Sequence, residues 1–380
     1  MVILKESEMD KKKWVKHLPL YILEVVLLAV CVCVLYFTLH VTDENGGVKK
    51  AEIKEENIVV NEEVKEKFDK QEEQTNDTDE AVYTGVFNIA FFGVDARDGS
   101  LGKGNRSDSI MICSIDMDVH EVRLISIYRD TYLNLGNDTY NKCNTAYAQG
   151  GPEQAISMIN MNTDMYITDY ITVGFEGLMK AVDALGGVEI DVKEEEISHL
   201  NNYQISMVGE SSDGKTFTAT AGDDYIPVTE PGLQTLNGLQ ATAYCRIRYI
   251  GDDFARTERQ RNVLIAMMEK GKTASIGTLT GALNAVMPHV QTSLDVEDII
   301  PVLGMIGDFK VTVSDGFPFA GMRNGGTIGS KGSCIVATSL EDNVKKLHEL
   351  LFNEENYEPS KELKSFSTII EQDTKDYLLY

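Results

Sequence analysis

Hydrophobic and polar positions form distinct blocks along this chain, and the pattern changes at about residue 86. Before that point, one long apolar stretch is followed by a polar stretch with only scattered Ile and Val. After it, short apolar runs bounded by turn-forming residues alternate with segments of helical periodicity. Because strands and helices alternate in this way in α/β proteins, we expect an α/β fold.

Strands are predicted at the start of the folded part, at Val86–Gly93, Ser109–Ile115 and Val122–Tyr128. The turn-forming segment Asp116–His120 joins the last two, so we expect them to be sheet neighbours. The later elements expected are a helix opened by Gly151-Pro152, a helix over Phe175–Leu185 ended by Gly186-Gly187, a strand over Val188–Val192, and a helix, strand, strand and helix over Asp295–Leu303, Phe309–Ser314, Gly332–Ala337 and Leu340–Phe352.

The apolar stretch over residues 18–41 matches the roughly twenty residues that a helix needs to cross a bilayer. The alternative is a cleaved signal peptide, but the bulky residues 34–40 stand where a small-residue cleavage site would be needed. Lysines precede the stretch and acidic residues follow it, which places the N-terminus in the cytoplasm and the rest outside. We therefore predict a single-pass membrane protein with an extracytoplasmic domain.

The patterning divides the chain into successive parts. The stretch after the apolar segment has too little apolar surface to offset the entropy of ordering, and we expect a flexible stalk there. Residues 194–231 are polar and contain Gly and Thr, so surface strands or a mobile loop are expected. The boundaries predicted are 1–17 for a cytoplasmic tail, 18–41 for the transmembrane helix, 42–85 for the stalk, 86–352 for the main folded domain and 353–380 for a loose tail.

Composition excludes some classes of function. A formal net charge of -25 argues against nucleic-acid binding, since no excess of Lys and Arg is available to neutralise a phosphate backbone. The cysteines outside the apolar stretch form no close pair with each other or with histidine, which argues against a zinc site. Disulfide pairing of Cys113, Cys143, Cys245 and Cys334 cannot be deduced from such scattered positions, and buried thiols are the simple alternative.

Charged residues follow the predicted strands. Asp95 comes directly after the first strand, Arg106 and Asp108 lie just before the second, and Arg129-Asp130 follows the third. Ligands of open α/β sheets bind at the carboxyl ends of strands, and two converging carboxylates suit Mg²⁺. The alternative is that Asp95 and Asp108 are ordinary turn residues.

A second charged group lies about a hundred residues later. From Arg256 onward the residues have the periodicity of a helix. Its inward face carries Arg256, Arg259, Gln260 and Val263, whereas Glu258 and Arg261 would face solvent. Inward guanidinium groups at a helix N-terminus suit an anion such as a diphosphate. Buried salt bridges are the competing explanation, and spacing does not decide between them. The remaining residues of this group are Arg246 and Arg248, which would point the same way if extended, and the possible partners are Asp252, Asp253 and Asp130.

These segments, in this order, resemble the LytR-CpsA-Psr (LCP) family of cell-wall glycopolymer transferases. The resemblance covers about Val86 to Phe352. One departure is Tyr128, where the family usually has proline before the Arg-Asp pair. The matching pieces are Phe87–Asp95, Arg106–Ser109, Ser126–Thr131, Asn144–Tyr147 with Gly150-Gly151, Val182–Val188, Leu236–Gly238 and Arg246–Arg261.

The resemblance implies one domain with a central mixed sheet flanked by helices, on a membrane anchor and a stalk. It implies a Mg²⁺-dependent phosphotransferase, with Mn²⁺ as an alternative ion. The enzyme would move a glycopolymer such as teichoic acid or capsular polysaccharide from undecaprenyl pyrophosphate to peptidoglycan through a phosphodiester. An apolar cleft for the polyprenyl tail is also implied. Residues that would suit its lining, and that are equally plausible as ordinary core, are Met158, Ile159, Phe175, Leu178 and Met179.

Carried over by position, the resemblance assigns roles to the charged residues. Asp95 and Asp108 would hold the metal, and Asp108 or Asp130 would act as the base, beside Arg129. The alternatives are a polyprenyl-pyrophosphate hydrolase and a non-catalytic regulator of the bacterial membrane that binds lipid phosphates. The residues implied to bind the pyrophosphate are Arg106, Arg129, Arg246, Arg248, Arg256 and Gln260.

Overall fold

The structure, a computed structural model, describes residues 49–50, 55–75, 85–96, 100–211, 216–294, 299, 302 and 304–379. It divides into residues 1–48 and a compact unit over residues 49–380. The tail and transmembrane helix expected over residues 1–41 lie outside the described residues, as does most of the helix expected at Asp295–Leu303. Among the described helices, none has the length and apolarity to cross a bilayer.

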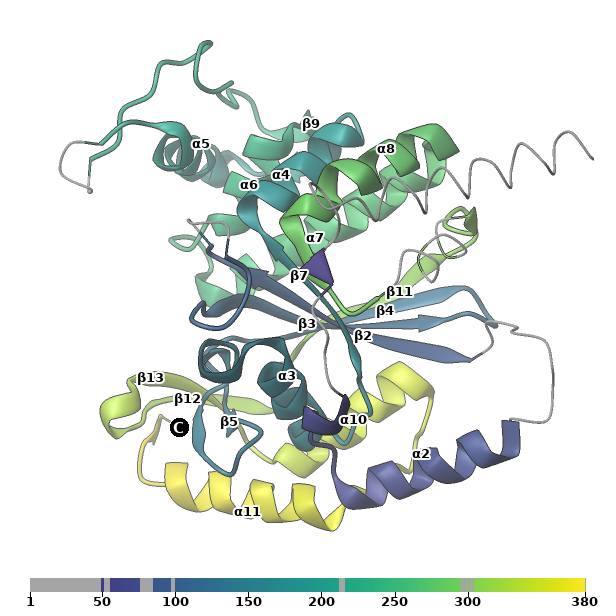
Figure 1. Cartoon of the computed structure of the whole chain (residues 1–380). Helices are drawn as coiled ribbons and strands as arrows, with labels where there is room; N and C mark the ends of the chain where they lie inside the picture. The colour runs from purple at the N-terminus through teal and green to yellow at the C-terminus, as the bar shows by residue number, and fades with distance from the viewer. Residues whose placement is uncertain are drawn as a thin grey trace, which may run out of the picture. The chain divides into compact units, whose positions relative to one another are not determined.

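A seven-stranded mixed sheet forms the centre of the compact unit (Figure 1). The runs predicted as neighbours are adjacent strands and pair antiparallel. The two outer partners of this trio, one on each side, are parallel to the strands they pair with. The α/β class and the mixed sheet are confirmed. In order across the sheet the strands are β1 (Lys49–Lys50), β10 (Val290–Thr292), β7 (Asp169–Gly174), β2 (Val86–Val94), β3 (Ser107–Asp116), β4 (Glu121–Ile127) and β11 (Lys310–Phe317).

Helices cover both faces of this sheet (Figure 1). One face carries α3 (Asn144–Thr163), α10 (Leu340–Phe352) and α11 (Lys361–Thr374), with α2 (Glu62–Thr75) alongside. The other face carries α4 (Phe175–Ala184), α5 (Glu194–Val208), α6 (Gly238–Arg246), α7 (Asp252–Thr273) and α8 (Ile276–Val286). Short 3-10 helices are η1 (Glu55–Asn57), η2 (Met287–His289) and η3 (Gly329–Lys331).

Small sheets complete the described part. The strand predicted at Gly332–Ala337 belongs to one of these sheets and not to the central one. The strand Val188–Val192 is likewise present, but in the described part of the chain it forms a separate antiparallel pair with a strand that follows α5. These sheets comprise β13 (Ser333–Ala337), β12 (Arg323–Thr327) and β14 (Leu378–Leu379); β5 (Tyr132–Asn134) and β6 (Tyr140–Lys142); and β8 (Val188–Val192) and β9 (Gly232–Leu236).

Part of the expected stalk is packed against the domain. Val64 in α2 is 4% exposed, and Asn61 donates hydrogen bonds to Asp164 Oδ1 at 2.6 Å and to Ser360 Oγ at 3.3 Å. Asp164 Oδ2 also accepts from the Ser360 amide, which precedes α11. The few apolar residues of this segment suffice because a buried polar cluster supplements them.

The C-terminal residues are also ordered, which corrects the expectation of a loose tail over 353–380. Leu363, Phe366 and Ile370 of α11 are buried in the main core, at the spacing of one helical face. The region expected as surface strands or a loop begins with α5, whose Leu200 is fully buried. In both regions the helical period was present in the sequence, but polar residues on the opposite face concealed it.

Candidate active site

The topology brings the predicted site residues to one edge of the sheet. The strands β2, β4 and β7 all end at this edge, because β7 is parallel to β2 and the antiparallel β3 separates β2 from β4. The first residues of β3 lie at the same edge. Asp95 follows β2, Asp108 stands at the start of β3 and Arg129 follows β4 after Tyr128.

A β-bulge orients Asp108. The register pairs Gly93 with Ser109 but Val94 with Ser107, so Asp108 is the extra residue between them. The strands approach closely at this point, because a Cβ on Gly93 would lie 2.9 Å from the Cβ of Ser109. The bulge turns the Asp108 side chain out of the ladder and into the adjacent pocket.

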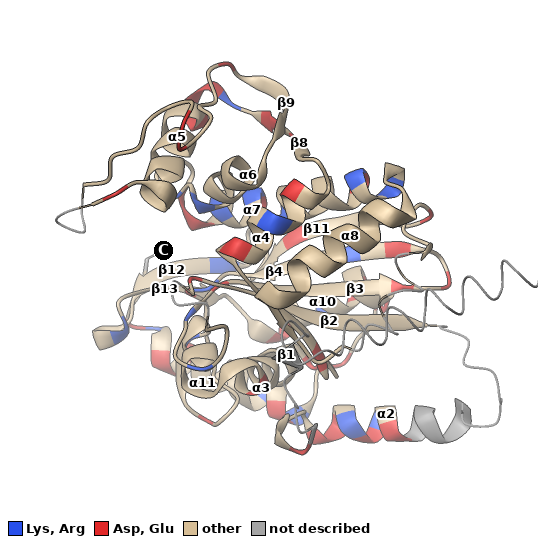
Figure 2. Cartoon of the chain, turned by 45° about the horizontal axis from the view of Figure 1, so that its top comes forward, with Lys and Arg blue, Asp and Glu red and all other residues tan. Residues whose placement is uncertain are grey.

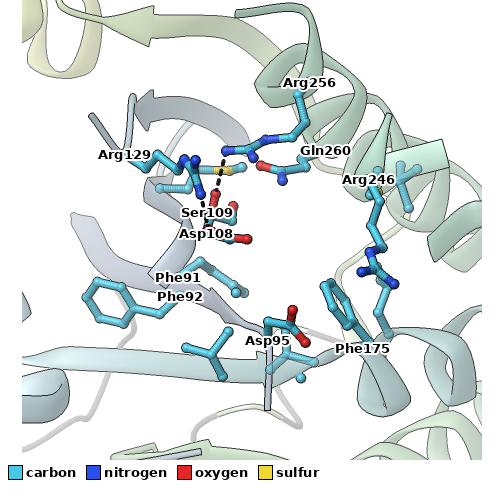
Figure 3. Close-up of a pocket in the computed structure, with 18 of the residues that line it drawn as sticks. Phe91, Phe92, Asp95, Asp108, Ser109, Arg129, Phe175, Arg246, Arg256 and Gln260 are labelled. Atoms are coloured by element: carbon cyan, nitrogen blue, oxygen red, sulfur yellow. Dashed lines mark hydrogen bonds and ion pairs between the residues drawn. The ribbon is translucent and has the colours of Figure 1, made fainter. Parts of the chain in front are cut away.

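A pocket of about 380 Å³ opens at this edge, between the sheet and the helices α4, α6 and α7 (Figure 3). One part of its lining is apolar and the other is charged, with four arginines against two aspartates. The charged residues are Asp95, Asp108, Arg129, Arg246, Arg248 and Arg256, and the apolar and aromatic ones include Phe91, Phe92, Met111, Val173, Phe175, Leu178, Tyr203, Val263 and Leu264.

This basic excess contrasts with the charge of the whole chain, which is -25. Figure 2 shows basic positions around α6 and α7, next to the sheet. Anions are therefore attracted to this pocket by local charge and not by the field of the whole protein.

Asp108 is the hub of the charged part. Arg129 Nη1 lies 2.5 Å from its Oδ1, and Arg248 Nη2 lies 2.8 Å from its Oδ2. Burial raises the pKa of this carboxyl, but the guanidinium groups of Arg129, Arg248 and Arg256 outweigh it and leave the pKa below its usual value. Asp108 is therefore a carboxylate at neutral pH.

Arg256 is buried with its hydrogen bonds incomplete. Its side chain is 2% exposed, and Nη2 reaches Asp253 Oδ1 at 2.8 Å and the Asp108 carbonyl oxygen at 3.2 Å. Nε and Nη1 have no hydrogen-bond partner among the described residues, and neither has Oε1 of Gln260, one turn further along α7. Burial lowers the pKa of Arg256, and Asp253 opposes that effect. Unpaired donors on a buried cation are costly, and an anion in the pocket would satisfy them.

Arg259, on the same helix, is also buried, but each of its guanidinium nitrogens has a hydrogen-bond partner. Its Nε donates to Glu196 Oε1 at 2.7 Å, and its terminal nitrogens donate to the carbonyls of Ile247 and Ile250 at 3.1 Å each. The competing explanation of buried salt bridging is therefore correct for Arg259. The prediction that Arg261 faces solvent is wrong, because α7 lies between two layers and Arg261 is 6% exposed, with its Nε donating to Ser314 of β11.

Arg246 and Phe175 form the far wall of the pocket. Arg246 is the last residue of α6 and is therefore not extended as expected, but both it and Arg248 line the pocket. The Arg246 guanidinium lies 4.6 Å from the centre of the Phe175 ring and 5.5 Å from that of Tyr203. Phe175 and Leu178 line the apolar part as implied for the lipid cleft, whereas Met158 and Ile159 are buried in the core of the opposite face.

Two predicted site residues lie apart from the pocket lining. Arg106 is exposed before β3. Asp130 faces away, with Lys142 Nζ 3.1 Å from its Oδ1 and Arg129 Nε at 3.6 Å from its Oδ2. Their assigned roles stay predictions, but the geometry gives them no direct place in the pocket.

From the sequence, Asp253 is predicted only as a possible salt-bridge partner. In the structure it lies beside the pocket arginines. Its Oδ1 is 2.8 Å from Arg256 and 3.8 Å from Arg129, while Oδ2 is buried without a partner among the described residues. Burial raises the pKa of its carboxyl, against the opposing effect of Arg256 and Arg129. Its position at the start of the arginine helix was the available signal.

Tyr128 packs where the family usually has proline. Its ring lies edge-on to Phe254 with centroids 4.6 Å apart, and its hydroxyl accepts from Arg323 Nη1 at 3.1 Å. Gly316 leaves room for it, since a Cβ there would lie 2.0 Å from the hydroxyl. The tyrosine therefore changes the packing behind Arg129, and Arg129 still reaches the pocket.

The cysteines, whose pairing the sequence left open, form no disulfide among the described residues. Cys113, Cys143, Cys245 and Cys334 are all free and buried. Across the described ranges, no three His, Cys, Asp or Glu side chains group closely enough to hold a metal ion by themselves.

A mixed α/β sheet with a basic, half-apolar pocket at its strand ends has the chemistry that suits an amphiphilic anion. Comparison with known proteins identifies the family. The LytR_cpsA_psr family profile matches residues 49–311, and the chain belongs to this family.

Among its relatives is the polyisoprenyl-teichoic acid–peptidoglycan teichoic acid transferase TagU of Oceanobacillus iheyensis. It is 32% identical over 57% of this chain and 61% of its own length. The chain thus spans about three fifths of this protein and of two further TagU relatives, with shares of 61%, 63% and 62%.

Solved structures share the fold. TagT bound to LI-WTA has a TM-score of 0.55 at 21% identity, over 71% of this chain and 90% of that one. The family protein YwtF (TagT) with bound octaprenyl pyrophosphate lipid has a TM-score of 0.51 at 21% identity, over 70% of this chain and 90% of that one.

Proposed function

We propose that this protein is a phosphotransferase that moves a glycopolymer from undecaprenyl pyrophosphate to peptidoglycan through a phosphodiester. The observation that carries the proposal is Arg256, a buried cation with unpaired donors beside an apolar cavity. A pyrophosphate with a polyprenyl tail has the matching chemistry. The name of TagU and the lipid in the YwtF (TagT) structure support this choice of donor.

The donor is held by charge at one part of the pocket and by apolar contact at the other. Arg129, Arg248 and Arg256 bind the phosphate oxygens, and Gln260 orients one of them. The polyprenyl tail lies along Phe175 and Leu178. When the pyrophosphate enters, Arg129 and Arg248 exchange Asp108 for phosphate oxygens, because a doubly charged group competes well for a guanidinium fork.

In the reaction, a peptidoglycan hydroxyl oxygen attacks the phosphorus that carries the glycan. The new P–O bond forms as the bond to the bridging oxygen breaks, and polyprenyl phosphate leaves with that oxygen. The arginines stabilise the charge that develops on the leaving phosphate. The hydroxyl proton goes to a carboxylate.

Asp253 suits the role of base better than Asp108 or Asp130. A base must have a free oxygen and enough basicity near neutral pH. Asp108 has both oxygens in ion pairs and a lowered pKa, and Asp130 binds Lys142. Asp253 is also outside the pocket lining, but it lies beside Arg256 and Arg129, its Oδ2 has no partner among the described residues, and its pKa is raised.

Asp95 and Asp108 fit a Mg²⁺ or Mn²⁺ ion. Both line the pocket, and Figure 3 shows both carboxylates facing its hollow. Mg²⁺ takes one or two carboxylates and fills its other positions with water and substrate phosphate oxygens, so two acids suffice. The ion would supply positive charge to the phosphate oxygens.

We also propose that the domain works outside the cell membrane, anchored by residues 18–41. A lipid-linked donor of this class meets peptidoglycan at the outer face of the cell membrane. An enzyme anchored in the same membrane is therefore close to its donor.

The test uses the full chain in phospholipid vesicles with a polyprenyl-pyrophosphate-linked glycan, Mg²⁺ and peptidoglycan fragments. The expected product is a glycan–peptidoglycan phosphodiester, formed in amounts equal to the released polyprenyl phosphate. Arg129→Ala should lower the rate by about a hundredfold or more, the usual effect of losing one transition-state donor. Arg323→Ala, which removes an arginine that contacts Tyr128 behind the site, is the matched control.

The other functions predict different products. Phosphorylated glycan that forms equally well without peptidoglycan would indicate a hydrolase. Lipid binding without turnover, equal in wild type and Arg129→Ala, would indicate a non-catalytic regulator and would overturn the proposal.

A further inference from the structure

The loop between α6 and α7 carries an exposed tyrosine beside the charged part of the pocket. Tyr249 is 82% exposed. It directly follows Arg248, which lines the pocket and pairs with Asp108 at 2.8 Å. The Tyr249 ring stacks on His199 of α5, with centroids 5.9 Å apart and planes inclined by 28°. Single exposed apolar side chains are common, so the exposure of Tyr249 alone does not indicate a function. The contacts that fix the backbone around the two rings are the further observation.

A buried ion pair fixes the loop that carries Tyr249. Arg259 and Glu196 are 2.7 Å apart, and their side chains are 6% and 3% exposed. The same guanidinium donates to the carbonyls of Ile247 and Ile250, which bracket Tyr249 in the chain. The tyrosine is therefore exposed on a backbone that is held on both sides.

The same ion pair fixes the other half of the stack. Glu196, His199 and Tyr203 are spaced three and four residues apart on α5, so they share one face of this helix. Tyr203 lines the pocket, which places this face toward the pocket mouth. A buried ion pair is a poor source of net stability, but it fixes geometry well. Here it holds two rings from segments far apart in sequence, each near a residue of the pocket lining, because Tyr249 follows Arg248 and His199 lies one turn before Tyr203 on α5.

The direction of the donor identifies what would meet these rings. In the proposed function the polyprenyl tail lies along Phe175 and Leu178, and the glycan is attached on the other side of the pyrophosphate, where Arg248 lines the pocket. Arg248, whose side chain is 43% exposed, marks the exit to solvent there. A pyranose ring has an apolar C–H face, and a tyrosine offers a flat, rigid contact surface at low entropic cost.

We propose that His199 and Tyr249 form a saccharide subsite that stacks on the first sugar attached to the donor pyrophosphate. The proposal rests on the proposed function, because that function places the sugar at this exit. Tyr249 is then a positioning and specificity-determining residue that acts on the glycan and not on the lipid.

The test compares two ligands: a polyprenyl pyrophosphate that carries one N-acetylhexosamine, and the same lipid without sugar. Binding of each to the full chain is measured in vesicles at a fixed salt concentration. Tyr249→Ala should weaken binding of the sugar-bearing lipid by about twofold to about tenfold, the range of an aromatic stacking contact, and leave the bare lipid unchanged. Tyr249→Phe should bind both as wild type does, since stacking needs the ring and not the hydroxyl.

The matched control is Tyr377→Ala, which removes a tyrosine that is 45% exposed and lies outside the pocket lining. It should change neither affinity. Equal effects of Tyr249→Ala on both lipids, or no effect on either, would overturn the subsite while leaving the proposed function intact. Failure of wild type to bind the bare lipid would instead overturn the proposed function.

Discussion

Two sides of α7 carry buried arginines that differ in how completely their nitrogens are hydrogen-bonded. Toward α5, Arg259 has a carboxylate and two carbonyls as partners. Toward the pocket, Arg256 is at least as buried, at 2% exposure against 5%, but two of its nitrogens have no partner among the described residues. The difference teaches that burial of a guanidinium does not identify a ligand site, whereas an incomplete set of partners does. Arg259 therefore has the contacts of a structural arginine, and Arg256 is the one that the proposed function assigns to the anion.

The largest effect is expected from Arg259→Ala, on stability. Removing one partner leaves Glu196 buried and unpaired, which costs about 3–5 kcal/mol in the free energy of unfolding. Urea denaturation of the domain measures it. The double variant Arg259→Met with Glu196→Met should recover most of the loss, and a double variant as unstable as the single one would contradict the structural role.

Arg256→Met should have the reverse profile. The transfer rate should fall by about 10²–10³-fold, because a donor to the transition state is lost. The free energy of unfolding should stay the same or rise, since a partly paired buried charge is removed. Parallel rate and denaturation measurements decide it: a large loss of stability would make Arg256 a second structural arginine.

Asp253→Asn tests the base beside Arg256. We expect the rate to fall by about a hundredfold, while lipid binding is retained. In wild type the rate should fall as pH drops through the pKa of Asp253, and burial places this fall at a higher pH than for an ordinary aspartate. A pH–rate profile measures it. A profile that is the same in the variant would exclude Asp253.

The smallest effect concerns Asp108, which bonds the pocket arginines in the absence of donor. Its folded-state pKa is lowered, so its stabilising contribution is present above the unfolded-state pKa and is lost as pH falls through the folded value. Because Arg248 is 43% exposed, solvent screening limits this contribution to about 1 kcal/mol or less. Unfolding measured against pH should show a shallower acid loss for Asp108→Asn than for wild type.

The sequence was sufficient to predict those site residues whose positions follow from strand ends and helical spacing. Asp95, Asp108 and Arg129 converge because three adjacent strands share an edge, and the register of Arg256 and Gln260 follows from the helical period. It was insufficient to predict burial that depends on a second layer of structure packed against a helix. Arg261 is buried because β11 packs behind α7, which no local pattern reveals.

Partners distant in the chain account for the other differences. Arg259 is structural because α5, some sixty residues earlier, supplies Glu196 at a separation of 63 residues. The segments 42–85 and 353–380 were expected to be flexible, yet Asn61, Asp164 and Ser360 join them through one buried cluster. Such clusters depend on tertiary proximity and leave no periodic trace.

The most direct test of the contrast between the two arginines is the binding of inorganic pyrophosphate, followed by the thermal unfolding of the full chain. If Arg256 is an anion ligand, pyrophosphate raises the unfolding temperature of wild type and of the Arg259→Met, Glu196→Met double variant, but not of Arg256→Met. An equal rise in Arg256→Met, or no rise in wild type, would contradict the account.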